Sequence, residues 1–66
     1  MNLQVEFEVE DDGRWIAEIP ALSGVLVYGS SRADAYQKAR ALALRVIADK
    51  IEHGELEETS FAFQAA

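Results

Sequence analysis

Carboxylates at every second position near the start of the chain are the groups best suited to do chemistry. Glu6, Glu8 and Glu10 alternate with apolar residues, and Asp11 and Asp12 follow directly. A metal-dependent nuclease needs several carboxylates that converge on two divalent ions. Glutamates two apart on a strand are separated by about 7 Å, and no further acid is placed to complete such a site. We therefore expect solvated glutamates and no bound metal.

Few other groups could take part in catalysis. The chain has no cysteine, which excludes disulfides and thiol nucleophiles. Its single histidine, His53, cannot form a zinc site without added carboxylates or a second chain. Ser30, Ser31 and His53 suggest a hydrolytic triad, but Ser31 suits a helix N-cap and His53 suits a helix C-terminus. We expect no catalytic residue and no cofactor, so that the protein is not an enzyme.

The charge distribution favours a basic protein as the partner. The formal net charge is −6. Residues 1–13 contain five acids and no base, and residues 54–66 contain three acids and no base. An acidic field repels phosphate backbones and attracts basic proteins, so we expect no direct contact with nucleic acid. The open alternative is that these charges only keep a small domain in solution.

Length and hydropathy indicate one small domain. A core built from 66 residues supplies only about 3–5 kcal/mol of stability. Because half of the residues are apolar, we expect a homodimer or a higher homo-oligomer. No apolar run is long enough to span a bilayer, and the first ten residues lack the apolar region of a signal peptide. We expect a cytoplasmic protein without membrane contact.

A hairpin of two strands is predicted at the start of the chain. Over residues 2–10, apolar and polar residues alternate with a period of two, which gives one dry face and one acidic face. The Asp-Asp-Gly sequence that ends at Gly13 is typical of a tight turn, because glycine allows a positive φ. A second strand is predicted over 14–19, and Pro20 ends it because proline has no N–H to donate to a ladder.

Trp15 has two interpretations. It shares a strand face with Ala17 and Ile19, which favours Trp15 as the main aromatic residue of the core. On the opposite face it would be an anchor for a partner. A third strand, rich in β-forming residues, is predicted over 25–28, and Gly29 is expected to end it.

A helix is predicted over residues 32–52. Ser31 is suited to be its N-cap, and Asp34 lies at the position of a capping-box acid. His53 and Gly54 are expected to end it. Seven residues at helical spacing should face the sheet: Ala35, Tyr36, Ala39, Leu42, Ala43, Val46 and Ile47. Two ion pairs are expected on the opposite side, Asp34–Lys38 and Arg45–Asp49.

A second apolar group lies on the helix beyond this arc and consists of Ala33, Ala41, Leu44, Ala48 and Ile51. A monomer of this size has little chain to cover it, so Leu44, Ala48 and Ile51 are candidate contacts between subunits. The alternative is that the C-terminal segment folds over the group. Alternating phenylalanines in that segment predict a last strand over 60–64.

These elements predict an α+β fold with the element order βββαβ. If the last strand joins the first in parallel, the crossover through the helix must be right-handed. The expected strand order is 3-2-1-4, with one helix packed on one face of a mainly antiparallel sheet.

The order of the motifs from Asp12 to Ala35 resembles a known family. The chain reads Asp12-Gly13-x-Trp15, then Ile19-Pro20-x-Leu22-x-Gly24, then Gly29-x-Ser31-x-x-Asp34-Ala35. This is similar to the HicB-like antitoxins, in which a D-G-aromatic strand ends in P-x-L-P-G and G-x-S/T-x-x-E/D-A opens a helix. The similarity covers about residues 3–53. Its residues have structural roles: Gly13, Trp15, Pro20, Leu22, Gly24, Gly29, Ser31 and Asp34.

The resemblance implies a partial ribonuclease-H-like fold without nuclease activity. It also implies one half of a type II toxin–antitoxin pair, in which the antitoxin covers a small, basic, mRNA-cleaving HicA-like toxin. An acidic sheet and hairpin could compete with RNA for such a toxin. The candidate contacts with this partner are Glu6, Glu8, Glu10, Asp11, Asp12 and Glu18.

The chain departs from the family pattern in two ways. Ser23 stands where the family usually has a second proline. Antitoxins of this family also continue into a C-terminal DNA-binding module, for which this chain leaves no room, so operator binding is not expected. The alternative function is a stand-alone regulatory or small-molecule-binding module that reuses the scaffold. That alternative predicts a pocket between the sheet and the helix.

Overall fold

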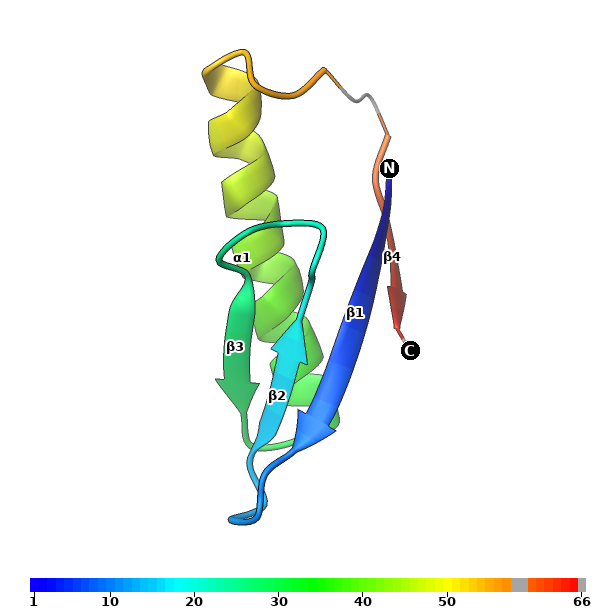
Figure 1. Cartoon of the computed structure of the whole chain (residues 1–66), viewed down its shortest axis with the longest axis vertical. Helices are drawn as coiled ribbons and strands as arrows, with labels where there is room; N and C mark the ends of the chain where they lie inside the picture. Colours follow the sequence, from blue (N-terminus) through cyan, green and yellow to red (C-terminus); the bar gives the residue numbers. More distant parts are fainter. Residues whose placement is uncertain (58–59, 66) are drawn as a thin grey trace.

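Four strands and one helix form two layers in the computed structural model of the protein, which describes residues 1–57 and 60–65 (Figure 1). In chain order the elements are β1 (Asn2–Val9), β2 (Trp15–Glu18), β3 (Leu26–Gly29), α1 (Arg32–Glu52) and β4 (Ala62–Ala65). The strand order is β3-β2-β1-β4, and α1 covers one face of the sheet. The predicted α+β fold, its element order and its strand order are confirmed.

Pairing within the sheet follows the predicted directions. β1 pairs with β2 and β2 pairs with β3 in antiparallel fashion, whereas β1 and β4 are parallel. The start of β1 is also tied to the C-terminal segment, because the Met1 amino group donates to the Ser60 carbonyl at 2.7 Å. On the face away from α1, Gln4 Nε2 donates to Gln64 Oε1 at 3.0 Å. The helix is thus the crossover between two parallel neighbours.

The strand boundaries differ from the predicted ones. β1 was expected over 2–10 and β2 over 14–19, but both are shorter, and the backbone of Arg14 and Glu10 closes the hairpin loop with a bond of 2.7 Å. β4 lies over Ala62–Ala65 rather than 60–64. β3 is shifted by one residue from the predicted bounds, covering Leu26–Gly29 instead of 25–28, so Gly29 is the buried last residue of the strand and not the residue after it.

Gly29 is required for the close approach of β3 to α1. A Cβ atom at this position would lie 2.4 Å from the backbone nitrogen of Ala35 and 2.7 Å from its Cα. The reason for glycine here is therefore steric, whereas Gly13, with a φ of 88°, is needed for the backbone conformation of the hairpin turn.

The core lies between α1 and the sheet face that it covers. It is formed by ten buried residues: Leu3, Val5, Ala17, Ile19, Leu22, Val25, Ala35, Ala39, Ala43 and Ile47. Three of the four from α1 are alanines, which lets the helix lie close to β2 and β3. Trp15 is half-buried and packs against this cluster, as expected for a core aromatic residue. The seven residues predicted to face the sheet are all buried or half-buried.

Local capping signals fix both ends of the helix. Ser31 is the N-cap, and its hydroxyl oxygen accepts from the Asp34 backbone N–H at 3.0 Å. At the other end Gly54 has a φ of 69°. Its N–H donates to the Ile51 carbonyl and that of Glu55 to the Lys50 carbonyl, which is the Schellman pattern. The predicted bounds of the helix, 32–52, are confirmed.

Only one of the two predicted ion pairs on the helix forms. Lys38 Nζ lies 3.0 Å from Asp34 Oδ2. Asp49 instead lies beside His53, with 3.5 Å between its Oδ1 and the His53 Nδ1. The histidine one turn further on is the better-placed neighbour, because its Nδ1 also lies 2.8 Å from the backbone oxygen of Asp49.

The C-terminal segment does not cover the second apolar group of the helix. β4 extends the sheet at the edge of β1, as Figure 1 shows. Leu44 remains 52% exposed and Ile51 47% exposed, and Ala33, Ala41 and Ala48 are exposed as well. The alternative in which this segment folds over the group is therefore wrong. Glu58, Thr59 and Ala66 lie outside the described residues.

Candidate functional site

The sheet face opposite α1 carries the acidic residues that the sequence singled out. The outward positions of β1, β2 and β3 are occupied by six residues, which we call the outer face: Glu6, Glu8, Ile16, Glu18, Leu26 and Tyr28. Helix α1 packs on the other side of the sheet, so it does not cover them. All are exposed except Ile16, which is half-buried.

Strand register arranges the outer face in two rows that cross the sheet. One row runs from Glu6 to Glu18 to Leu26, and the other from Glu8 to Ile16 to Tyr28. Carboxylates therefore lie toward β1 and apolar side chains toward β3. A hollow of about 210 Å³ lies beside them, lined by Glu6, Phe7, Glu8, Ile16, Glu18 and Leu26.

The pairing of Glu6 with Glu18 has an energetic cost. Like charges directly opposite each other on neighbouring antiparallel strands destabilise a sheet. Neither carboxylate forms an ion pair with any residue in 1–57 or 60–65. Arg14 lies beside the outer face, with its guanidinium 4.7 Å from the centre of the Tyr28 ring. A cation brought by another molecule would relieve the repulsion between the two glutamates.

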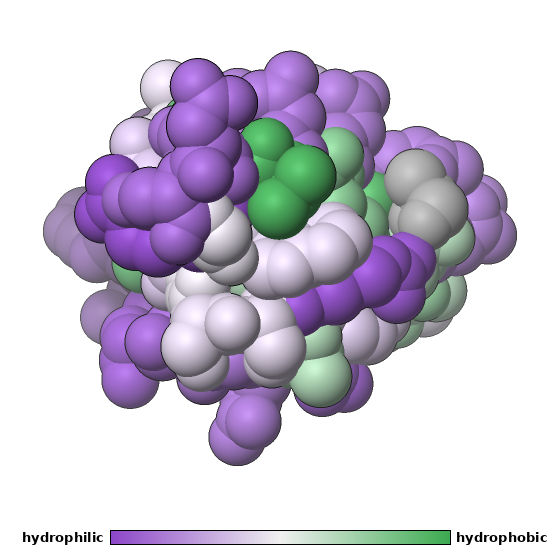
Figure 2. All heavy atoms as spheres, turned by 90° about the horizontal axis from the view of Figure 1, so that it is seen from below, coloured by the Kyte–Doolittle hydropathy of each residue, from purple (hydrophilic) through white to green (hydrophobic). Residues whose placement is uncertain are grey.

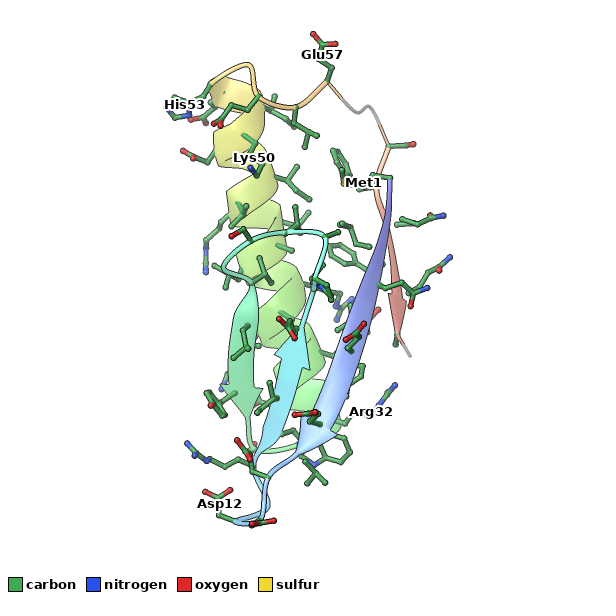
Figure 3. The ribbon with its side chains drawn as sticks, in the orientation of Figure 1. Met1, Asp12, Arg32, Lys50, His53 and Glu57 are labelled. Carbon is green, nitrogen blue, oxygen red and sulfur yellow. The ribbon has the colours of Figure 1, made fainter. Side chains whose placement is uncertain are left out.

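The acids of the hairpin loop form a separate group at one end of the molecule. Asp12 lies at the tip, far from Lys50, His53 and Glu57 at the opposite end (Figure 3). Its Oδ2 lies 2.9 Å from Arg14 Nε, and its Oδ1 accepts from the Arg14 backbone N–H at 3.1 Å. That backbone bond, together with the charge of Arg14, lowers the pKa of Asp12 below its usual value. Asp12 is therefore already engaged within its own chain.

Glu10 and Asp11 complete the set of predicted contacts. Asp11 is exposed in the turn and Glu10 is half-buried beyond the end of β1. Seen from the hairpin end, hydrophilic residues cover much of the surface, and a strongly hydrophobic area lies near the centre of the view (Figure 2). Of the six predicted acids, the structure thus brings Glu6, Glu8 and Glu18 together on one face of the sheet and leaves the other three in the loop.

A groove at the start of the helix is the second candidate site. It has a volume of about 320 Å³ and is lined by Arg14, Tyr28, Gly29, Ser30, Asp34 and Lys38. Asp34 accepts from the Ser30 backbone N–H at 2.9 Å and pairs with Lys38, and these two contacts lower the pKa of Asp34. Each charged group in the groove therefore has an opposite charge beside it. The groove is lined by the end of β3 and by the first two turns of α1, so it lies at one edge between the sheet and the helix, where the small-molecule hypothesis expects a pocket.

Residues 1–57 and 60–65 show neither a cluster of metal-ligating side chains nor a helix that could span a membrane. This part of the chain contains no group of three or more acidic, histidine or cysteine side chains placed to hold a metal ion. Nor does it contain a helix long and apolar enough to cross a membrane.

The sequence pattern places Ile16 and part of the third strand on the outer face, because the alternation that puts Glu18 outward also puts Ile16 there, but it does not identify these apolar residues as part of a site. Leu26 could be placed only once the register of β3 against β2 was known.

No family model, curated protein or solved structure matches the chain.

Proposed function

We propose that the protein is a non-catalytic binding module of the HicB-like antitoxin type, which occludes a small, basic, HicA-like toxin. The motif order over residues 3–53 supports this proposal, and so does the βββαβ element order with strand order 3-2-1-4. Within this proposal the fold is a partial ribonuclease-H-like fold, and the outer face is the surface that contacts the toxin.

The observation that carries the proposal is the unpaired row of Glu6 and Glu18 on an exposed sheet face. An arginine or lysine of the toxin would remove the repulsion between these carboxylates and would itself keep a charge partner on binding. Ile16, Leu26 and Tyr28 lie directly beside the acids and supply the apolar contact area that a protein interface also needs.

The mechanism is occlusion. A toxin that grips RNA presents a basic surface, and the acidic outer face competes for that surface with the phosphate backbone. No bond is made or broken, so inhibition depends on the population of the complex and weakens as salt screens the charges.

A calorimetric titration with a HicA-like toxin tests the proposal. The test variant is E6Q/E18Q, and the matched control is E55Q/E57Q, which removes the same charge from the far end of the molecule. We expect E6Q/E18Q to bind at least about tenfold more weakly, because contacting charge pairs are worth more than 1.4 kcal/mol. The control should bind like the natural chain.

Three outcomes would contradict the proposal. The first is the absence of binding by the natural chain at micromolar concentration and low salt. The second is an equal loss of affinity in both double variants, which would indicate a general effect of net charge. The third is toxin binding that survives E6Q/E18Q unchanged.

A further inference from the structure

An apolar stripe remains exposed along α1 on the side away from the sheet. We define the stripe as Ala41, Leu44, Ala48 and Ile51, all of which are exposed. Leu44 and Ile51 keep about half of their surface in solvent, at 52% and 47%. The described C-terminal segment does not cover the stripe, because β4 pairs with β1 at the edge of the sheet.

The spacing of the stripe is that of a helix–helix seam. Its members are separated by three, four and three residues, which is the alternating spacing at which apolar residues line a contact between two helices. The core-facing residues Ala35, Ala39, Ala43 and Ile47 follow their own four-residue spacing on the other side of α1. The helix thus has two separate packing faces, of which the structure fills one.

The order of small and large residues in the stripe selects an antiparallel arrangement. Around a two-fold axis that passes midway between Leu44 and Ala48, Ala41 lies opposite Ile51 of a second copy, and Leu44 lies opposite Ala48 of that copy. Every layer then combines one alanine with one large side chain, which fills space evenly. A parallel pair would instead place alanine on alanine and leucine on leucine, with alternating gaps and bulges.

The charges beside the stripe select the same arrangement. On one side of it, Lys38 and Arg45 precede Asp49 and Glu52 along the helix. In an antiparallel pair about this axis Lys38 lies near Glu52 of the second copy, while Arg45 lies at the centre of the interface, where it meets both Arg45 and Asp49 of that copy. The Lys38 side chain contacts Asp34 within its own chain but remains 56% exposed, so it can also reach a second copy.

We propose that two copies of the chain associate through this stripe as an antiparallel helix pair. The result is a four-layer dimer, sheet–helix–helix–sheet, in which both outer faces point outward. The dimer therefore adds buried apolar area to a small core and leaves two outer faces free for partners. This interface goes beyond the proposed function, because it involves no toxin.

Sedimentation velocity over the micromolar range, with the protein alone, tests the association. We expect a dimer for the natural chain. L44E places a charge in the centre of the stripe, and we expect it to weaken the dimer by about tenfold or more. The matched control is L26E, which adds the same charge at a leucine that is 46% exposed on the outer face, and it should remain dimeric.

Cysteine cross-linking tests the orientation and does not depend on L44E folding. The natural chain has no cysteine, so introduced thiols react only with each other. On mild oxidation, A41C/I51C should give a disulfide-linked dimer, whereas A41C alone should not. A monomeric natural chain, a dimer unaffected by L44E, or efficient cross-linking of A41C alone would overturn the proposal. None of these results bears on toxin binding, which the titration above tests separately.

Discussion

Replacing Gly29 with alanine tests how closely β3 approaches the helix. The added Cβ would lie 2.4 Å from the Ala35 nitrogen and 2.7 Å from its Cα. Ordinary van der Waals contact begins at 3.4 Å, so the two elements must separate by about 1 Å. Both contacted atoms belong to the backbone in the first turn of α1, and no rotamer change can move them away.

The cost should lie at the upper end of the range for overpacking. Added methyl groups in tight contacts typically cost about 1–3 kcal/mol, and we expect about 3 kcal/mol at Gly29 because only backbone movement relieves the contact. A domain of this size has roughly 3–5 kcal/mol of stability. The G29A variant should therefore lose more than half of its free energy of unfolding, which urea denaturation followed by circular dichroism would measure.

Two further variants make this prediction specific. In G54A the new Cβ meets no atom within 4 Å, so only the positive φ of 69° opposes it, at about 1 kcal/mol. Adding A35G to G29A removes the Ala35 Cβ but not its nitrogen or Cα, so A35G should not restore stability. A loss below about 1 kcal/mol in G29A, or recovery on adding A35G, would refute the steric explanation.

Three other changes probe the helix cap and the core. S31A removes the N-cap acceptor and should lower the free energy of unfolding, measured in urea, by about 1 kcal/mol. S30A keeps the backbone N–H that donates to the Asp34 carboxylate, so its loss should be much smaller. Because the pKa of Asp34 is lowered in the folded state, its charge adds stability above about pH 4, and this stability is lost as the pH falls through the folded-state pKa. In D34N the free energy of unfolding should therefore depend less on pH in the acidic range, and an unchanged dependence would contradict this role of Asp34. L3A removes a fully buried side chain and should cost about 2–5 kcal/mol, while V9A, at a residue that is 60% exposed, should stay within about 0.5 kcal/mol, and equal losses would contradict the core.

Local signals and chain topology were sufficient to predict most of the fold. The ends of α1 could be predicted because Ser31, His53 and Gly54 cap the helix through hydrogen bonds to residues a few positions away in the chain. The predicted strand order followed from the hairpin turn at Gly13, which makes the first two strands neighbours, and from the expectation that the last strand joins the first in parallel. These features depend on few long-range contacts, which explains why the sequence alone could indicate them.

Features that depend on contacts between different helices and strands could not be predicted from the sequence in this way. The role of Gly29 follows from the distance between β3 and α1, which only packing determines. Leu26 joins the outer face through the register of β3 on β2, and the connection after Pro20 left that register open. Asp49 lies beside His53 because the His53 ring is held 2.8 Å from the Asp49 backbone oxygen, a contact of the helix C-cap that charge spacing alone does not indicate.

The candidate site was predicted in its acidic half only. Alternation placed Glu6, Glu8 and Glu18 on the wet side of the first two strands, and the structure brings them together there. The structure also separates these three glutamates from Asp12, whose carboxylate is bound to Arg14 of the same chain. The candidate binding surface therefore contains three of the six predicted acids, Glu6, Glu8 and Glu18, together with the apolar residues beside them.

Amide chemical-shift mapping of the isotope-labelled protein during titration with a HicA-like toxin tests the outer face most directly. We predict that shifts and line broadening concentrate on Glu6, Glu8, Ile16, Glu18 and Leu26, while the amides of the stripe on α1 stay unchanged. Perturbations confined to the stripe, or to the hairpin loop around Asp12, would contradict the claim that the outer face is the binding surface.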